Sequence, residues 1–107
     1  MAELKLVQLA QQDLKDIWRG LAEYRLEIAD QKIKRITKKL ELLRQFPLAG
    51  RQRDDLLPNI RSIPVDQFLV FYRILQEGDR TIVEINRIVD GKRNLQQLFN
   101  DSESEEP

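Results

Sequence analysis

The spacing of hydrophobic residues divides the first half of the chain into one short strand and two helices. Residues 4–9 have the period of a short strand. The apolar residues that follow recur at intervals of three and four, and so lie on one face of a helix that ends between residues 20 and 25: Ala10, Leu14, Ile17, Trp18 and Leu21. A second stripe predicts a longer helix over residues 26–46, which Pro47 terminates: Ile28, Ile33, Ile36, Leu40 and Leu43.

The second half has the pattern of strands joined by turns. Residues 48–59 form a loop rich in charge and in turn residues, and a strand over residues 60–66 follows, weakened by Pro64. Residues 68–75 form a strand that is apolar on both faces, and a link containing Gly78 predicts a hairpin to the strand 81–89. Strict alternation places Ile82, Glu84, Asn86 and Ile88 opposite Val83, Ile85 and Val89. A short helix is expected over residues 92–100, with Leu95, Leu98 and Phe99 facing inward.

This order of elements predicts an α+β fold. We expect an N-terminal strand, an α-helical hairpin packed on one face of a mainly antiparallel sheet, and a short C-terminal helix. Residues 1–100 are interpreted as a single domain, and residues 101–107 as an acidic, disordered tail. The hairpin covers only one face of the strand 68–75, so we expect an apolar patch on the other face, over which a second chain lies or to whose edge it adds a strand.

Composition excludes several classes of chemistry. The chain has no His and no Cys, which excludes structural zinc, haem, cysteine nucleophiles and Ser-His triads. No acidic loop with calcium-type spacing is present, so we expect neither a metal nor another cofactor. No window of the sequence is apolar enough to span a membrane, and the first residues do not resemble a secretory signal, so a cytoplasmic location is expected.

Charge is balanced in total but not along the chain. Basic residues gather in residues 30–44, where a solvated helix face is favoured over an anion-binding stripe, and acidic residues gather in the last seven. Three arginines interrupt the apolar strands, and two further cations follow them: Arg61, Arg73, Arg87, Lys92 and Arg93. Each strand arginine is either a contact for an anionic partner or one half of an internal ion pair, for which Asp66, Glu84 and Asp90 are near in sequence.

Several segments together resemble the ParE/RelE superfamily of toxins from bacterial toxin–antitoxin systems, in its ParE branch. The segments are Ala10-x-x-Asp13-Leu14-x-x-Ile17-Trp18 and residues 46–51, 54–65, 68–73 and 85–93. Their order and spacing carry the resemblance, which covers residues 4–99. It implies a cognate antitoxin as partner in a hetero-oligomer, and the candidate residues for that contact are Trp18, Leu69, Phe71 and Leu75.

The resemblance leaves two targets open. RelE-type members cut mRNA on the ribosome, and ParE-type members inhibit DNA gyrase without a known catalytic step. If the chain is a nuclease, Arg61, Lys92 and Arg93 are the catalytic candidates, because cleavage requires neutralised phosphate charge. Phe99, however, stands where RelE-type toxins carry a tyrosine, and Asp90 stands where the ParE motif usually has histidine. Asp90 is expected to cap the following helix instead.

The missing tyrosine and histidine leave no evident general base and favour gyrase inhibition by binding. Under that hypothesis the target-binding candidates are Arg61, Arg73, Arg87, Lys92 and Arg93. The alternatives are a ribosome-dependent mRNA endonuclease and an inactive toxin-fold protein that only binds its antitoxin.

Overall fold

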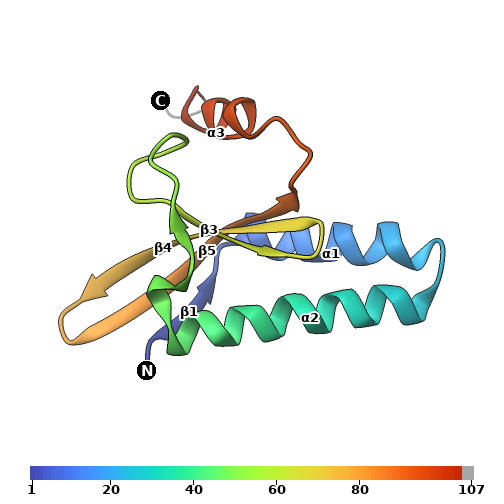
Figure 1. Ribbon diagram of the computed structural model, residues 1–107, viewed down its shortest axis with the longest axis horizontal. Helices are drawn as coiled ribbons and strands as arrows, with labels where there is room; N and C mark the ends of the chain where they lie inside the picture. The colour runs from blue at the N-terminus through green and yellow to red at the C-terminus, as the bar shows by residue number, and fades with distance from the viewer. Residues whose placement is uncertain (105–107) are drawn as a thin grey trace.

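The predicted order of helices and strands is confirmed, with one short strand added (Figure 1). The computed structural model describes residues 1–104, and the side chains of residues 1–100. Its elements are β1 (Glu3–Leu6), α1 (Gln8–Ala22), α2 (Leu26–Gln45), the 3-10 turn η1 (Pro47–Ala49), β2 (Arg51–Gln52), β3 (Arg61–Val65), β4 (Phe68–Glu77), β5 (Arg80–Asp90) and α3 (Leu95–Ser104).

Two boundaries differ from those expected. The first helix already begins at Gln8, so the first strand is shorter than residues 4–9. The last helix runs to Ser104 and so enters the segment that we expected to be a disordered tail. Residues 105–107 lie outside the described residues, and for them the expectation stays a prediction.

The five strands form one mixed sheet in the order β1-β5-β4-β3-β2. β1 runs parallel to β5, and the other pairs are antiparallel, so the mainly antiparallel sheet is confirmed. α1 and α2 lie side by side as an antiparallel hairpin against one face of the sheet, and α3 lies beyond the other face (Figure 1). The β4–β5 hairpin projects beyond both neighbouring strands, because β1 and β3 are shorter.

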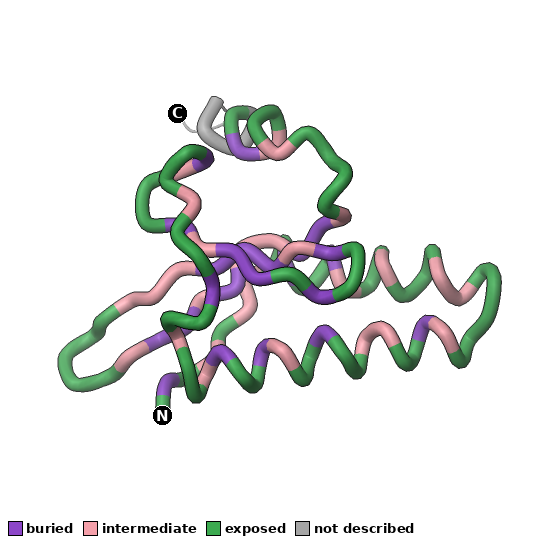
Figure 2. The backbone as a smooth tube through the Cα atoms, viewed as in Figure 1, coloured by how far each residue is buried: buried purple, intermediate pink, exposed green. Residues whose placement is uncertain are grey.

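The main hydrophobic core lies between the helical hairpin and the sheet, where buried positions follow both elements (Figure 2). From α2, Ile36 and Leu43 are fully buried, as the predicted stripe requires. The sheet contributes Val70, Val83, Ile85 and Ile88. Leu14 and Ile17 of α1 are partly buried against this core.

A second, smaller core lies on the opposite face, under α3. It comprises Leu56, Ile60, Phe71, Val89 and Phe99. The rings of Phe71 and Phe99 meet edge to face, with centroids 4.9 Å apart. The expected uncovered apolar face is therefore wrong at Phe71, whose exposed fraction is 0%, because α3 and the loop before β3 cover it.

A β-bulge in β5 accounts for one wrong prediction of facing. Phe71 pairs with Arg87 and Tyr72 pairs with Ile85, so Asn86 has no partner on β4. The extra residue shifts the alternation by one, as bulges do. Ile88 therefore joins Ile85 in the main core and Val89 turns to the second core, the reverse of strict alternation.

Tyr72 fastens the connection after α2 to the sheet. Its hydroxyl donates to the Pro47 carbonyl (2.7 Å) and accepts from the Gly50 N–H (2.8 Å). Burial raises the pKa of this hydroxyl, so it stays protonated and able to donate. Glycine is required at position 50, because a Cβ there would lie 2.6 Å from Tyr72 Oη and 2.8 Å from the Ser62 carbonyl oxygen.

Candidate functional site

Arg87 is a structural residue. Its Nε and Nη2 donate to the two carboxylate oxygens of Asp13 at 2.8 and 3.0 Å, and the side chains are only 14% and 10% exposed. Asp13 also accepts the backbone N–H of Ile88 at 2.9 Å. The geometry is a bidentate arginine–carboxylate fork. It corrects the prediction of Arg87 as a target-binding residue.

Asp13 was missed as the partner because it lies 74 positions from Arg87 in the chain. The expected partners were close in sequence, and none of them binds Arg87. The available signal was a polar residue within the apolar-periodic first helix, next to Leu14 on its inner side.

Arg61 and Arg73 line the same cavity, which has a volume of about 570 Å³. Its lining comprises Gln52, Pro58, Asn59, Arg61, Arg73, Ile74 and Leu75. Arg61 Nη1 donates to the Gly50 carbonyl at 2.6 Å. The Arg73 side chain makes no hydrogen bond or ion pair within the described part of the chain, and its buried Nε is unsatisfied. The register places the two arginines on opposite faces of the sheet, because Arg61 pairs with Tyr72, the neighbour of Arg73 on β4.

Lys92 and Arg93 form a separate cationic site in the turn between β5 and α3. Both are exposed, and neither makes an ion pair with the residues described here. Asp90 Oδ1 accepts the Lys92 N–H at 2.9 Å, so Asp90 stabilises this turn. The cap of α3 is Asn94, whose Oδ1 accepts the Gln97 N–H at 3.0 Å. The expectation that Asp90 caps the helix is thus wrong.

The two cationic sites lie far apart along the sheet. Arg73 pairs with Glu84, and the turn holding Lys92 follows Asp90 at the other end of β5. From Glu84 to Asp90 an extended strand spans about 20 Å. Arg61, Lys92 and Arg93 therefore do not converge on one phosphate, as a catalytic trio would require.

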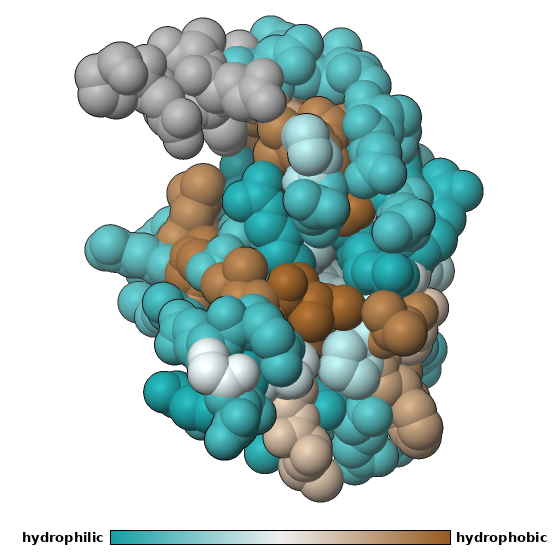
Figure 3. Space-filling view, turned by 90° about the vertical axis from the view of Figure 1, so that its left-hand side faces the viewer, coloured by the Kyte–Doolittle hydropathy of each residue, from teal (hydrophilic) through white to brown (hydrophobic). Residues whose placement is uncertain are grey.

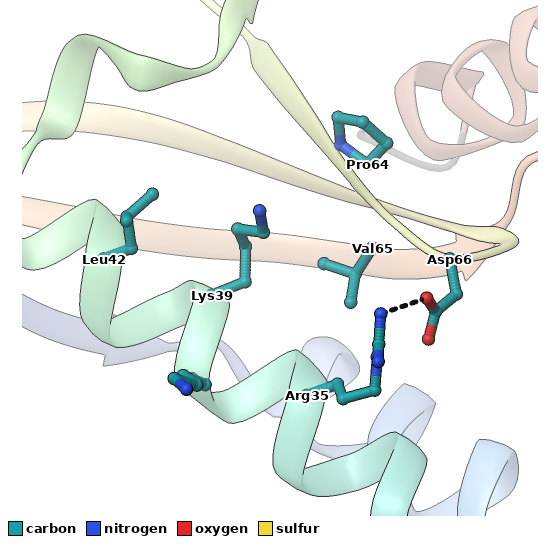
Figure 4. Close-up of a pocket in the computed structure, with 7 residues that line it drawn as sticks. Arg35, Lys39, Leu42, Pro64, Val65 and Asp66 are labelled. Atoms are coloured by element: carbon teal, nitrogen blue, oxygen red, sulfur yellow. Dashed lines mark hydrogen bonds and ion pairs between the residues drawn. The ribbon is translucent and has the colours of Figure 1, made fainter.

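The basic face of α2 borders a cavity of about 420 Å³ beside the β3–β4 turn (Figure 4). Lys32 and Arg35 donate to the Asp66 carboxylate at 3.0 and 2.8 Å. The hydrogen bond from Lys32, followed by that from Arg35, holds the pKa of Asp66 below its usual value. Lys32 and Arg35 thus share a single carboxylate, whereas Lys38 and Lys39 line the cavity without a salt bridge to any described residue.

Neither tyrosine of the chain is placed to act as a general base at the cationic sites. Tyr72 is enclosed and its hydroxyl is fully occupied. Tyr24 is 84% exposed at the tip of the helical hairpin. Phe99 is 3% exposed, and the space under α3 is filled with apolar side chains.

The expected antitoxin-binding residues have unequal accessibility. Trp18 is 37% exposed, and its indole N–H donates to Asp30 at 2.9 Å, which ties α1 to α2. Leu69 is partly buried beside the second core, and Leu75 lines the Arg61–Arg73 cavity. Phe71 is fully buried, so it offers no surface to a partner.

Within residues 1–104 no helix has the length and hydropathy needed to cross a membrane. Nor do three or more acidic side chains gather there as metal ligands would.

Comparison with known proteins identifies the family. The family described as the ParE toxin of the type II toxin–antitoxin system, parDE, matches residues 4–95. Toxin ParE3 of Caulobacter vibrioides is 36% identical over 84 residues, which is 78% of this chain and 80% of the relative.

Two solved structures share the fold. The chromosomal ParDE toxin–antitoxin system of P. aeruginosa aligns with a TM-score of 0.71 at 22% identity, over 84% of this chain and 96% of that one. The YoeB/ParE toxin of Agrobacterium tumefaciens aligns with a TM-score of 0.60 at 15% identity, over 82% and 97%. The chain belongs to the ParE toxin family of type II toxin–antitoxin systems.

Proposed function

We propose that this toxin binds DNA gyrase in the cytoplasm and stalls it on cleaved DNA, without a catalytic step of its own. The observation that carries the proposal is Phe99. This residue stands where RNA-cutting members of the superfamily are expected to have a tyrosine, and it is buried against Phe71 with centroids 4.9 Å apart. A phenyl ring cannot transfer a proton, and its packing leaves no room for another acid or base beneath α3.

Its partner in the cell is a cognate antitoxin. Support comes from the family description and from the relative of P. aeruginosa, which is named as a ParDE system. Trp18, Leu69 and Leu75 are the remaining antitoxin-binding candidates, because all three are at least partly exposed. An antitoxin that covers them forms a hetero-oligomer with the toxin, and we expect co-expression to improve the solubility of the toxin and to suppress its toxicity.

The target-binding residues that we favour are Lys92 and Arg93, because both are exposed and neither side chain makes an ion pair with a described residue. We expect Arg93→Ala to weaken toxicity and to leave antitoxin binding intact. Arg19→Ala is the matched control, since Arg19 is an exposed arginine on α1 with no side-chain partner among the described residues. Loss of folding in Arg93→Ala, seen by circular dichroism, would recast Arg93 as structural.

The proposal is tested with purified gyrase, ATP and relaxed plasmid. Added toxin should reduce supercoiling and trap a cleavage complex that denaturation reveals as linear DNA. Unchanged supercoiling with no trapped complex would exclude gyrase as the target. New mRNA 5′ ends on translating ribosomes would then indicate nuclease activity, and unimpaired growth on induction would indicate an inactive antitoxin-binding protein.

A further inference from the structure

Two basic segments that are far apart in the sequence lie on either side of the β3–β4 turn. On one side, Lys32 and Arg35 of α2 donate to the Asp66 carboxylate at 3.0 and 2.8 Å. On the other side, the N–H of Gly91 donates to the Gln67 carbonyl at 2.9 Å, which holds the turn between β5 and α3 against the same place. The basic face of α2 and the cationic site that follows β5 are therefore neighbours in the folded chain.

Together these two segments form one strongly positive surface, which we call the basic surface. Its cations are Lys32, Arg35, Lys38, Lys39, Lys92 and Arg93, and its carboxylates are those of Asp66 and Asp90. The last four of these cations make no ion pair with any residue that the structure describes. Charges act on a partner within about 8–10 Å, so this surface attracts anions although the chain as a whole is neutral.

The helical part of the basic surface is a row along one side of α2. Lys32, Arg35 and Lys39 follow one another at intervals of three and four residues, and so lie on successive turns of the same side. Figure 4 shows Lys39 pointing from α2 toward β3, while Arg35 turns to Asp66. The row is about 10 Å long, which is the length of about three successive phosphates on one strand of a duplex.

The surroundings of this row favour a phosphate backbone over other anionic partners. The cavity beside α2 is lined without any aromatic ring, so unpaired bases have no side chain on which to stack. Pro64 in the same lining has no N–H to donate, which disfavours the addition of a peptide strand. Two of the unpaired cations are the neighbouring lysines of the cavity, Lys38 and Lys39, which bind phosphate as point charges.

Apolar surface of the kind that a protein partner covers is found at another end of the molecule. Figure 3, which shows the left-hand side of the view in Figure 1, has a band of hydrophobic side chains with hydrophilic ones above and below. The β4–β5 hairpin projects toward that side, whereas the β3–β4 turn lies at the opposite end of β4 (Figure 1). The basic surface is thus free to bind a second partner.

We infer that the basic surface binds the phosphate backbone of duplex DNA without reading its bases. The inference deepens the proposed function and rests on it in one respect, which is that the DNA bound during inhibition is the segment held by gyrase. Contacts from α2 and from the turn after β5 then hold the toxin on the DNA while it blocks the enzyme. Binding of free duplex DNA does not depend on gyrase.

The test is fluorescence anisotropy with a short labelled DNA duplex over a series of salt concentrations. We expect a dissociation constant of about 10⁻⁴–10⁻⁶ M near physiological salt and tighter binding at lower salt, as for other sequence-independent complexes. Changing Lys38→Gln and Lys39→Gln together should lower the slope of log K against log salt by about 1.8, the contribution of two phosphate contacts. Arg93→Ala should lower it by about 0.9.

Matched variants separate recognition from folding and from net charge. Lys5→Gln with Lys15→Gln removes the same charge from exposed lysines of β1 and α1, and should bind like the parent. Lys38→Arg with Lys39→Arg keeps both charges and should keep the salt slope. Lys38 and Lys39 make no ion pair with a described residue, so the melting temperature of the glutamine variant should match that of the parent.

A second arm uses gyrase itself. The Lys38→Gln, Lys39→Gln variant should bind gyrase without DNA as the parent does, but should trap less cleaved DNA. A parent protein that binds duplex DNA and leaves gyrase unaffected would retain the DNA site and remove only the proposed function.

Three results would overturn the inference. The first is equal DNA affinity of the Lys38→Gln, Lys39→Gln variant and the Lys5→Gln, Lys15→Gln control. The second is tighter binding of an RNA duplex of the same length that is lost in the first variant, which would assign the surface to RNA. The third is no binding of DNA at low salt by a protein whose fold is intact.

Discussion

β5 and β4 each continue beyond the end of a shorter neighbouring strand, which leaves one edge of each without a strand beside it. A side chain of α1 closes the edge of β5, whereas the edge of β4 stays open. β1 pairs with β5 only as far as Leu6↔Ile85. Just beyond that point Asp13 from α1 accepts hydrogen bonds from the Ile88 N–H and from Nε and Nη2 of Arg87. β3 pairs with β4 only as far as Arg61↔Tyr72, and beyond it the Arg73 side chain has no hydrogen-bond acceptor in the part of the chain that the structure describes. Both edges carry an arginine, but only one has a carboxylate.

The comparison shows that an arginine in an apolar strand can either form an internal ion pair or lack an internal acceptor, and that the strand sequence does not distinguish the two. Arg87 and Arg73 both interrupt apolar strands, and their sequence neighbourhoods gave them the same two interpretations. A helix lies over the first edge and supplies the counter-charge, whereas no helix lies over the second (Figure 1). We therefore assign the closed edge to stability and the open edge to binding.

Breaking the closed edge should have the largest effect. Asp13→Ala leaves the Arg87 guanidinium and the Ile88 N–H buried without an acceptor. We expect the free energy of unfolding to fall by about 3–5 kcal/mol, measured by urea denaturation. Asp16→Ala is the control, because Asp16 is exposed and bonds only to Gln12. A loss below about 1 kcal/mol for Asp13→Ala would place this ion pair among exposed pairs of little value.

Weakening the packing of α3 on the second core should have the second largest effect on stability. Phe99→Ala removes the ring that packs on Phe71, and we expect a loss of about 3 kcal/mol from the cavity and the lost burial. Thermal unfolding measures it, and exposure of the second core should appear as binding of a hydrophobic dye. An unchanged melting temperature would mean that α3 does not close this face in solution.

The ion pairs at the β3–β4 turn predict a smaller effect that depends on pH. Lys32 and Arg35 lower the pKa of Asp66, so its contribution is present above the unfolded pKa and is lost as pH falls through the lower folded value. Stability should therefore decline below about pH 4. Asp66→Asn should flatten this decline and make the remaining stability less sensitive to salt. Identical pH profiles for the two proteins would contradict it.

Arg73→Leu should have the smallest effect on folding. The change removes a buried donor that has no acceptor, so we expect the free energy of unfolding to stay within about 0.5 kcal/mol or to rise. The measurement is the same urea titration. Destabilisation comparable to that of Asp13→Ala would show that Arg73 has an internal role and would remove the contrast between the two edges.

Most of the fold was predictable from the sequence. Only tertiary contacts, however, separated the candidate residues that are used inside the chain from those available for binding. The stripes Ile36–Leu40–Leu43 and Ala10–Leu14–Ile17 gave the helical hairpin, because a period of 3.6 depends on nearby residues alone. The strand β2 was missed since two residues carry no period. The bulge at Asn86 was missed for the same reason, and it reversed the facing of Ile88 and Val89.

The sequence by itself determined the element order, the amphipathic helices, the family resemblance and the absence of His and Cys chemistry. These properties are local, or are carried by the order of short motifs along the chain. Only the tertiary structure decided that Arg87 belongs to Asp13, that Phe99 covers Phe71, and that the edge of β4 beside Arg73 stays open. Each of those depends on residues far apart in the chain, and no periodicity records which distant side chain reaches a given strand.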